Sequence, residues 1–152
     1  MTNVVPLLPN LSSATLAEDE VTISRLCGLF ETAFIEHEVD DDGDILITDG
    51  LDVAVWVQID NQRKLIVLVT QYRVDDEPPA DWLARVNDMN ATVAVPQFCY
   101  RKDAIWGSHW ITYDGGLNVR QFIKMLRRFA GAFRAGIELH KSEGVESPRR
   151  SV

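Results

Sequence analysis

The sequence predicts an α+β protein in which two groups of antiparallel strands are separated and flanked by helices, in the order α-β-β-β-α-β-β-α. Three observations support this prediction. Strand-like apolar runs occur in two blocks, residues 45–72 and 92–113. Apolar residues at three- and four-residue spacing lie before, between and after these blocks. Strands and helices do not alternate one for one, as a parallel sheet would require.

The first helix is predicted over residues 22–37, after a loose arm. Thr22 suits the N-cap. Residues 1–20 contain Pro, Ser and Thr without a sustained period, so we expect a flexible N-terminal arm there and a single domain over residues 21–140. The apolar residues of the helix recur at helical spacing: Ile23, Leu26, Cys27, Phe30, Ala33 and Phe34.

Three strands are predicted next, over residues 45–48, 52–58 and 64–72. Asp49-Gly50 separates the first two, and Asp-Gly between apolar runs is a strong hairpin signal. In the middle strand Val53, Val55 and Val57 alternate with more polar residues. We therefore expect an antiparallel meander with one buried face and one mixed face.

A short helix over residues 80–89 and a second hairpin follow. The acidic and proline-containing run at 75–79 stops the preceding strand and favours a helix N-terminus. The second hairpin is predicted over residues 92–100 and 104–113, turning at 101–103. Pro96 has no N–H to donate, so its strand lies at a sheet edge or carries a bulge.

The last helix, over residues 118–140, has the clearest pattern. Asn118 and Gln121 form a capping box at its start. Phe122, Leu126, Phe129, Phe133 and Ile137 fall on one side at 100° per residue, and Arg120, Lys124, Arg127, Arg128 and Arg134 fall on the other. The polar residues 141–152 are predicted to form a disordered tail.

Composition excludes several classes of protein. The chain of 152 residues has a net charge of −8, which argues against nucleic acid as its main partner. The apolar runs are too short for a transmembrane helix, and the first residues lack the basic start of a secretory signal. Cys27 and Cys99 are far apart in apolar contexts and are expected to be reduced core thiols. We expect a cytoplasmic protein.

No catalytic, cofactor or metal motif is evident in the sequence. The acidic turn at 38–49 partly matches a calcium loop, but Glu38 and Asp49 stand where that motif requires Asp and Glu. A solvated turn is the preferred interpretation, with a weak divalent-cation site as the alternative. Ser108 and His109 are neighbours in a strand, so their side chains point to opposite faces. We expect no catalytic residue and no cofactor.

Two groups of residues are candidates for protein contacts. Trp106 and Trp110 share one face of a predicted strand, and Trp56 extends that patch from another strand. Tryptophan is enriched at interface hot spots, although core packing is the alternative explanation. The second group is the basic face of the last helix, which either contacts a protein or is solvated: Arg120, Lys124, Arg127 and Arg128.

Several segments resemble the YbjN family of bacterial proteins. They are the helix that begins at Thr22, the VDDDGDIL turn at 39–46, the strand at 52–58, the helix at 80–90 with its NDMN ending, and the helix that begins at Asn118. The resemblance covers residues 21–139. It implies a fold similar to the type III secretion chaperones, often found as a homodimer.

The resemblance implies a function through protein contacts. Members of the family are regarded as candidate regulators of sensory transduction without a settled biochemical activity, and no family catalytic residue can be carried over. We therefore expect a non-enzymatic homodimer that regulates by binding a protein partner. The alternative is a chaperone that binds an extended segment of a client protein. We expect neither a nucleic-acid partner nor a membrane span.

Overall fold

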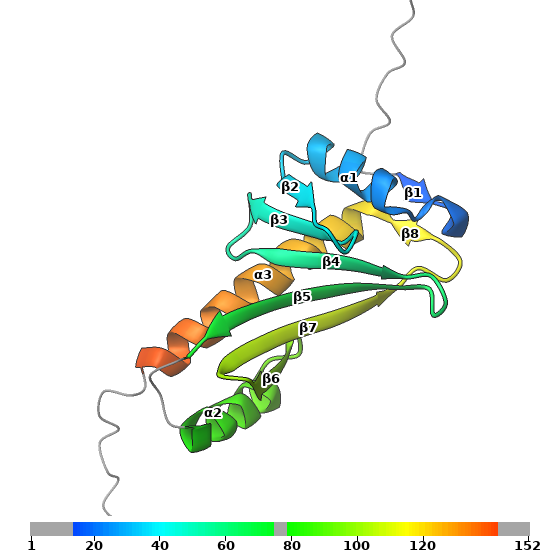
Figure 1. Cartoon of the computed structure of the whole chain (residues 1–152). Coiled ribbons are helices and arrows are strands. Elements are labelled where there is room, and N and C mark those ends of the chain that lie inside the picture. Colours follow the sequence, from blue (N-terminus) through cyan, green and yellow to red (C-terminus); the bar gives the residue numbers. More distant parts are fainter. Residues whose placement is uncertain (1–13, 75–78, 143–152) are drawn as a thin grey trace, which may run out of the picture.

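The computed structural model describes residues 14–74 and 79–142 (Figure 1). Its helices are α1 (Ile23–Thr32), α2 (Pro79–Thr92) and α3 (Val119–Ser142), with a short 3-10 turn, η1 (Glu18–Glu20), before α1. Its strands are β1 (Thr15–Leu16), β2 (Glu36–Val39), β3 (Ile45–Asp49), β4 (Val55–Asp60), β5 (Leu65–Arg73), β6 (Gln97–Arg101), β7 (Ala104–Thr112) and β8 (Leu117–Asn118).

The main sheet has six strands in the order β2-β3-β4-β5-β7-β6, and each neighbouring pair is antiparallel. The predicted α+β class and antiparallel pairing are confirmed. β6 lies at one edge of the sheet, as Pro96 indicates. β1 and β8 form a separate two-stranded sheet near the start of α3.

Three helices pack against one face of the main sheet. The central strands bury alternate residues on this covered face: Ile45, Ile47, Val55, Val57, Ile66, Leu68 and Ile105. α3 crosses the sheet diagonally (Figure 1) and enters two hydrophobic clusters. Phe122, Leu126 and Phe129 pack with α1 and β3–β5, whereas Phe133 and Ile137 pack with α2, β6 and the start of β7. The opposite face of the sheet carries no helix of the described residues.

The first helix is shorter than predicted. α1 begins after Thr22, whose side chain accepts a hydrogen bond from the Arg25 N–H, but it ends at Thr32. Phe34 has a left-handed φ of 57°, and the Ile35 N–H donates to the Phe30 carbonyl in a helix-ending bond. The chain then forms β2, a strand absent from our prediction. Phe34, predicted to face the core, is 92% exposed.

The predicted two-residue hairpin at Asp49-Gly50 is also wrong. Gly50 does adopt a positive φ of 88°, but the next strand begins only at Val55. Residues 50–54 form a longer connection, so Val53 is partly buried outside the strand. The extra length is stabilised by Thr70, whose hydroxyl donates to the carbonyl of Ala54 at 2.8 Å.

Part of the predicted N-terminal arm is fixed to the domain. Thr15 and Leu16 pair with β8, and the side chain of Leu16 is buried. Glu18 accepts a hydrogen bond from the Gly115 N–H and pairs with Lys64, and both interactions lower its pKa below the usual range. The arm prediction is therefore wrong for residues 14–20. Residues 1–13 lie outside the described residues.

The ends of the other helices also differ. Asn118 accepts a hydrogen bond from the Gln121 N–H at 2.9 Å, as the predicted cap requires. α3 continues to Ser142, past the predicted start of the tail, and α2 continues to Thr92 instead of ending at Met89. The acidic and proline-containing run at 75–78 and the predicted tail at 143–152 lie outside the described residues.

Gly107 of β7 lets the Phe133 ring of α3 pack closely on the sheet. A Cβ at this position would lie 2.5 Å from the Phe133 ring, which stacks on Phe98 and has no free space to move into. We expect Gly107→Ala to lower the free energy of unfolding by about 1–3 kcal/mol, because the core becomes overpacked. Urea denaturation measures this change. Gly28→Ala is the matched control, since its Cβ would meet nothing within 4 Å. This substitution should raise the free energy of unfolding by a few tenths to about 1 kcal/mol, because Ala favours a helix more than Gly does.

Candidate functional site

The three predicted tryptophans lie on the open face of the sheet, which we define as the face opposite the helices. The register places Trp56 between Leu46 and Val69, and Trp110 beside Val67. Gly107, two residues after Ile105, points toward α3, so Trp106 and Trp110 point the other way. The side chain of Trp110 is 61% exposed. The strands thus assemble an apolar surface from residues far apart in sequence.

Trp106 is more enclosed than Trp110. The Arg101 guanidinium lies over its ring, 4.5 Å from the centroid. Its indole nitrogen is buried and has no hydrogen-bond acceptor among the described residues. The fourth tryptophan of the sequence, Trp82, is fully buried in the cluster between α2 and α3. Trp82 therefore belongs to the core and not to the open face.

The predicted basic face lies on α3. Its residues are exposed and make no ion pair with any described residue: Arg120, Lys124, Arg127 and Arg128. Arg134 differs from them, because it pairs with Glu138 at 2.8 Å. α3 packs its apolar side on the covered face, so this basic face and the tryptophans lie on opposite sides of the sheet. The structure does not bring the two predicted groups together.

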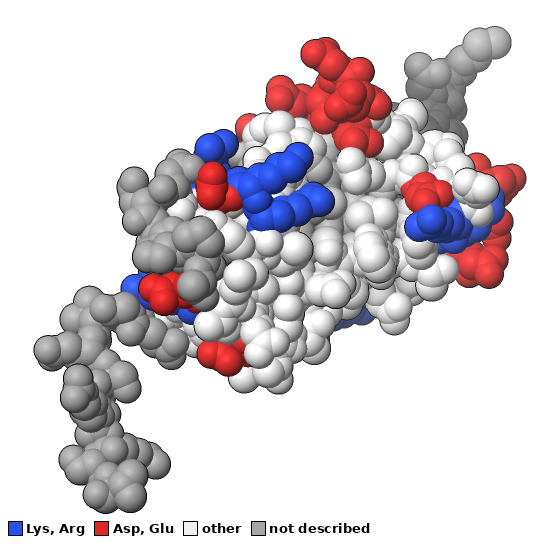
Figure 2. All heavy atoms as spheres, turned by 60° about the horizontal axis from the view of Figure 1, so that its bottom comes forward, with Lys and Arg blue, Asp and Glu red and all other residues white. Residues whose placement is uncertain are grey.

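Figure 2 shows a broad area without charged side chains, with acidic groups near its outline and a group of Lys and Arg side chains in its upper left part. An area without charged side chains costs less to desolvate than a charged one. Charge alone therefore does not prevent an apolar partner from approaching this side of the molecule.

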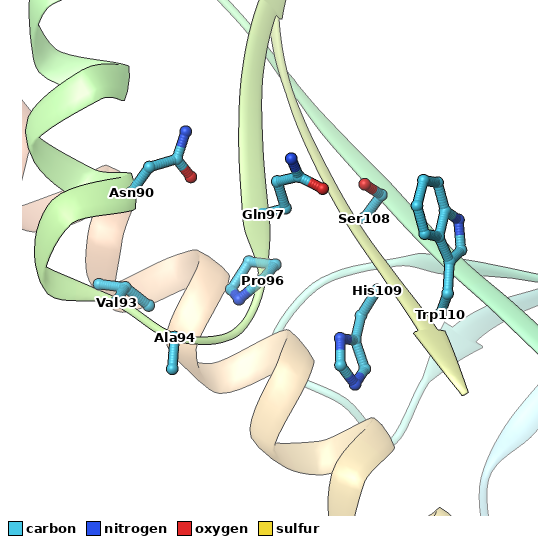
Figure 3. Close-up of a pocket in the computed structure, with 8 residues that line it drawn as sticks. All are labelled: Asn90, Val93, Ala94, Pro96, Gln97, Ser108, His109 and Trp110. Atoms are coloured by element: carbon cyan, nitrogen blue, oxygen red, sulfur yellow. The ribbon is translucent and has the colours of Figure 1, made fainter. Parts of the chain in front are cut away.

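A hollow of about 490 Å³ lies where β6 begins (Figure 3). Its walls come from the end of α2 and the connection to β6 on one side, and from β7 on the other: Asn90, Val93, Ala94, Pro96, Gln97, Ser108, His109 and Trp110. In Figure 3 the rings of His109 and Trp110 point to opposite sides of β7. Sequence reasoning did not identify this hollow, because it depends on how α2 packs beside β6.

Asn90 holds this corner of the fold together. Its side-chain amide donates to the Phe98 carbonyl at 2.9 Å and accepts from the Phe98 N–H at 2.8 Å. These are the two hydrogen bonds that a neighbouring strand would make with Phe98. One side chain thus covers the outer edge of β6.

A second hollow, of about 380 Å³, lies on the other side of His109 and Trp110. The first turns of α3 and the start of β8 form its far wall, with Leu117, Phe122 and Met125 among the lining residues. Burial lowers the pKa of His109 below the usual histidine value. His109 is therefore more often neutral than a histidine in solvent.

The acidic turn forms the β2–β3 hairpin. Asp40 Oδ1 accepts hydrogen bonds from the N–H groups of Asp42 and Asp44, at 3.0 and 2.9 Å. This carboxylate therefore organises the turn. Within residues 14–74 and 79–142, no three His, Cys, Asp or Glu side chains come together as metal ligands would.

The two cysteines are in different environments. Burial raises the pKa of the Cys27 thiol, which reduces its nucleophilic thiolate form. Cys99 is exposed on the open face, so our prediction of a core position is wrong for this residue. Its strand alternates between faces, and Phe98, not Cys99, points into the core.

The fold and the site define a class: a small α+β protein whose helices cover one face of an antiparallel sheet and leave the other face open. The YbjN family model, described as "Putative bacterial sensory transduction regulator", matches residues 22–138. This chain belongs to the YbjN family. No protein with a curated description matches the sequence significantly.

Two solved structures are similar in fold. The crystal structure of YbjN from E. coli superposes with a TM-score of 0.68 at 12% identity, covering 88% of this chain and 99% of that one. The HopA1-SchA chaperone-effector complex contains a chain with a TM-score of 0.52 at 15% identity, covering 75% of this chain and 88% of that one. The expected similarity to a secretion chaperone fold is confirmed. No helix of the described residues is long and apolar enough to span a membrane.

We predict that Asn90→Ala lowers the free energy of unfolding by about 1–3 kcal/mol, because it leaves the Phe98 backbone groups without partners. Asn87→Ala makes the same change one turn earlier on α2, at an exposed side chain, and should stay within about 0.5 kcal/mol of the parent. Urea denaturation of both variants measures the difference. Equal stability would show that Asn90 does not secure β6.

The lowered pKa of His109 predicts a pH dependence of stability. Between the folded-state pKa and the higher pKa of the unfolded chain, the unfolded chain binds more protons. Stability is therefore present above the usual histidine pKa and falls as the pH drops through that window. Denaturation at a series of pH values should show a shallower slope for His109→Gln. An unchanged slope would assign the pH dependence to other groups.

Proposed function

We propose that this protein is a non-enzymatic regulator of the bacterial cytoplasm that acts by binding another protein on the open face of its sheet. One observation carries the proposal: three helices pack on the covered face, which leaves Trp56, Trp106 and Trp110 together on the other. The family description supports a regulatory role. Cys27 and Cys99 are not joined by a disulfide, which suits a reducing compartment.

The open face suits a protein partner for physical reasons. Large aromatic side chains contribute much of the binding energy where they become fully buried. Trp110 exposes 61% of its surface, and its neighbours Val67 and Val69 are only partly buried. A partner that covers these residues removes apolar area from water, at about 25 cal/mol per Å². Binding through this face should therefore depend little on salt.

We also propose that the protein is a homodimer. Two exposed apolar side chains outside the open face support a dimer: the side chain of Phe34 is 92% exposed and that of Leu83 is 57% exposed. A second copy that covers either of them would leave the open face available to the partner. The resemblance to dimeric chaperones supports the same state.

The second candidate function is that of a chaperone for an extended segment of a client. It is favoured by the fold similarity to a chain of the chaperone-effector complex. An apolar sheet face can hold an unfolded segment as well as a folded partner. The two functions differ in the state of the bound protein: a client segment is protease-sensitive outside the contact, whereas a regulatory partner is folded.

Native mass spectrometry of the protein isolated gently from its own host tests the proposal. We expect a dimer that carries a defined second polypeptide. Trp56→Lys should lower recovery of that polypeptide at least ten-fold, because it places a charge in the centre of the contact. Ser24→Lys, which makes the same charge change on α1, should recover it fully. A monomer at all concentrations would contradict the dimer, and equal recovery by both variants would contradict the open face as the binding surface.

A further inference from the structure

β7 has a free edge over its last four residues. β5 pairs with β7 along its whole length, from Ala104 to Thr112. On the other side β6 pairs with β7 only as far as Ser108, which lies opposite Gln97. The residue before Gln97 is Pro96, which has no N–H and ends the strand. Residues 109–112 therefore have a strand neighbour on one side only.

The direction of the backbone groups follows from the register. The N–H of Tyr113 donates to the Lys64 carbonyl, on the β5 side. Backbone groups alternate in direction along an antiparallel strand, so His109 and Ile111 also point toward β5. Trp110 and Thr112 then direct their N–H and carbonyl groups away from β5, toward the free edge.

The two hollows described above flank this edge. His109 and Trp110 line both of them. One far wall consists of residues 93–97, and the other of the first turns of α3 with the start of β8. The free edge therefore lies recessed between two walls (Figure 3 shows the first).

The recess selects the kind of chain that can pair with β7. In a second copy of this protein β7 lies between the same two walls, so two β7 edges could pair only with all four walls brought around the contact. A single extended segment has no such walls. Its backbone can supply both the acceptor and the donor that Trp110 and Thr112 need.

We propose that an extended segment of a partner protein adds to the sheet as a strand beside β7, pairing with Trp110 and Thr112. This inference rests on the proposed function and specifies its binding mode. The segment needs a free N–H at the pairing positions, so proline is excluded there. Side chains directed to the helix side enter the hollows, where Val93 and Pro96 line one and Leu117, Phe122 and Met125 the other. Apolar side chains fit these positions.

A phage-displayed library of random twelve-residue peptides is the probe, and the full chain is the target. Selected peptides are synthesised with a fluorescent label, and their affinity is measured by anisotropy. Amide hydrogen exchange, followed by NMR, then locates the binding site. We expect bound peptide to slow the exchange of the Trp110 and Thr112 amides, because both become hydrogen-bonded.

Two substitutions at Trp110 distinguish what its backbone N–H contributes to peptide binding from what its side chain contributes. Trp110→Ala removes the indole and keeps the N–H, whereas Trp110→Pro removes both. The Trp110 N–H does not pair with β5, so proline there leaves the sheet intact, and circular dichroism checks the fold. We expect Trp110→Pro to bind about ten-fold more weakly than Trp110→Ala. Thr112→Pro against Thr112→Ala repeats the comparison at the second outward position.

Each outcome of the peptide experiment either supports or contradicts strand addition at β7. Peptides that slow exchange at Trp110 and Thr112 and distinguish Pro from Ala support the strand addition. Peptides that protect other residues, equal binding by the two variants, or a selection without binders overturn it. Protection of both amides in a dimer without peptide, lost on dilution, would assign the edge to a second copy and also overturn it. Failure here leaves the proposed function standing if Trp56→Lys still releases the native partner.

Discussion

The contact between α3 and the sheet at Gly107 is the constraint on which the rest of the structure depends. Only a residue without a side chain lets Phe133 approach the strand and stack on Phe98. The same helix packs Phe122 and Phe129 into the other cluster. α3 therefore contributes to both hydrophobic clusters and packs along the sheet that β5 and β7 make continuous. Because the helices cover one face of the sheet, the other face stays open and carries Trp56, Trp106 and Trp110.

Much of the fold follows from local sequence signals. The caps at Thr22 and Asn118, the turn before β7 and the position of Pro96 were all predictable, since each depends on a few neighbouring residues. The end of α1 was not, because the apolar spacing continues through Phe34 although the backbone there is left-handed. β1 also gave no signal, since two residues acquire strand structure only by meeting β8.

The candidate site, like the fold, was only partly predictable from the sequence. Strand alternation predicted that Trp106 and Trp110 share one face and that Trp56 extends it, and the register places all three on the open face. The free edge of β7 could not be found in this way. It results from a difference in length between β6 and β7, and from the packing of α2 and α3 on either side. Such features depend on which segments meet in space, and apolar periodicity carries no information about that.

The sheet's two outer strands are protected from uncontrolled aggregation by different means. β2 is short and carries exposed Glu36 and Glu38, whose charges repel a like strand. β6 has no such charge pair at its centre, but the Asn90 amide occupies the backbone groups of Phe98. A single carboxamide thus makes the two hydrogen bonds that a neighbouring strand would make at Phe98. Chemical deamidation of Asn90 would replace its N–H donor with a carboxylate oxygen that repels the Phe98 carbonyl, and so would free this edge to pair with another strand.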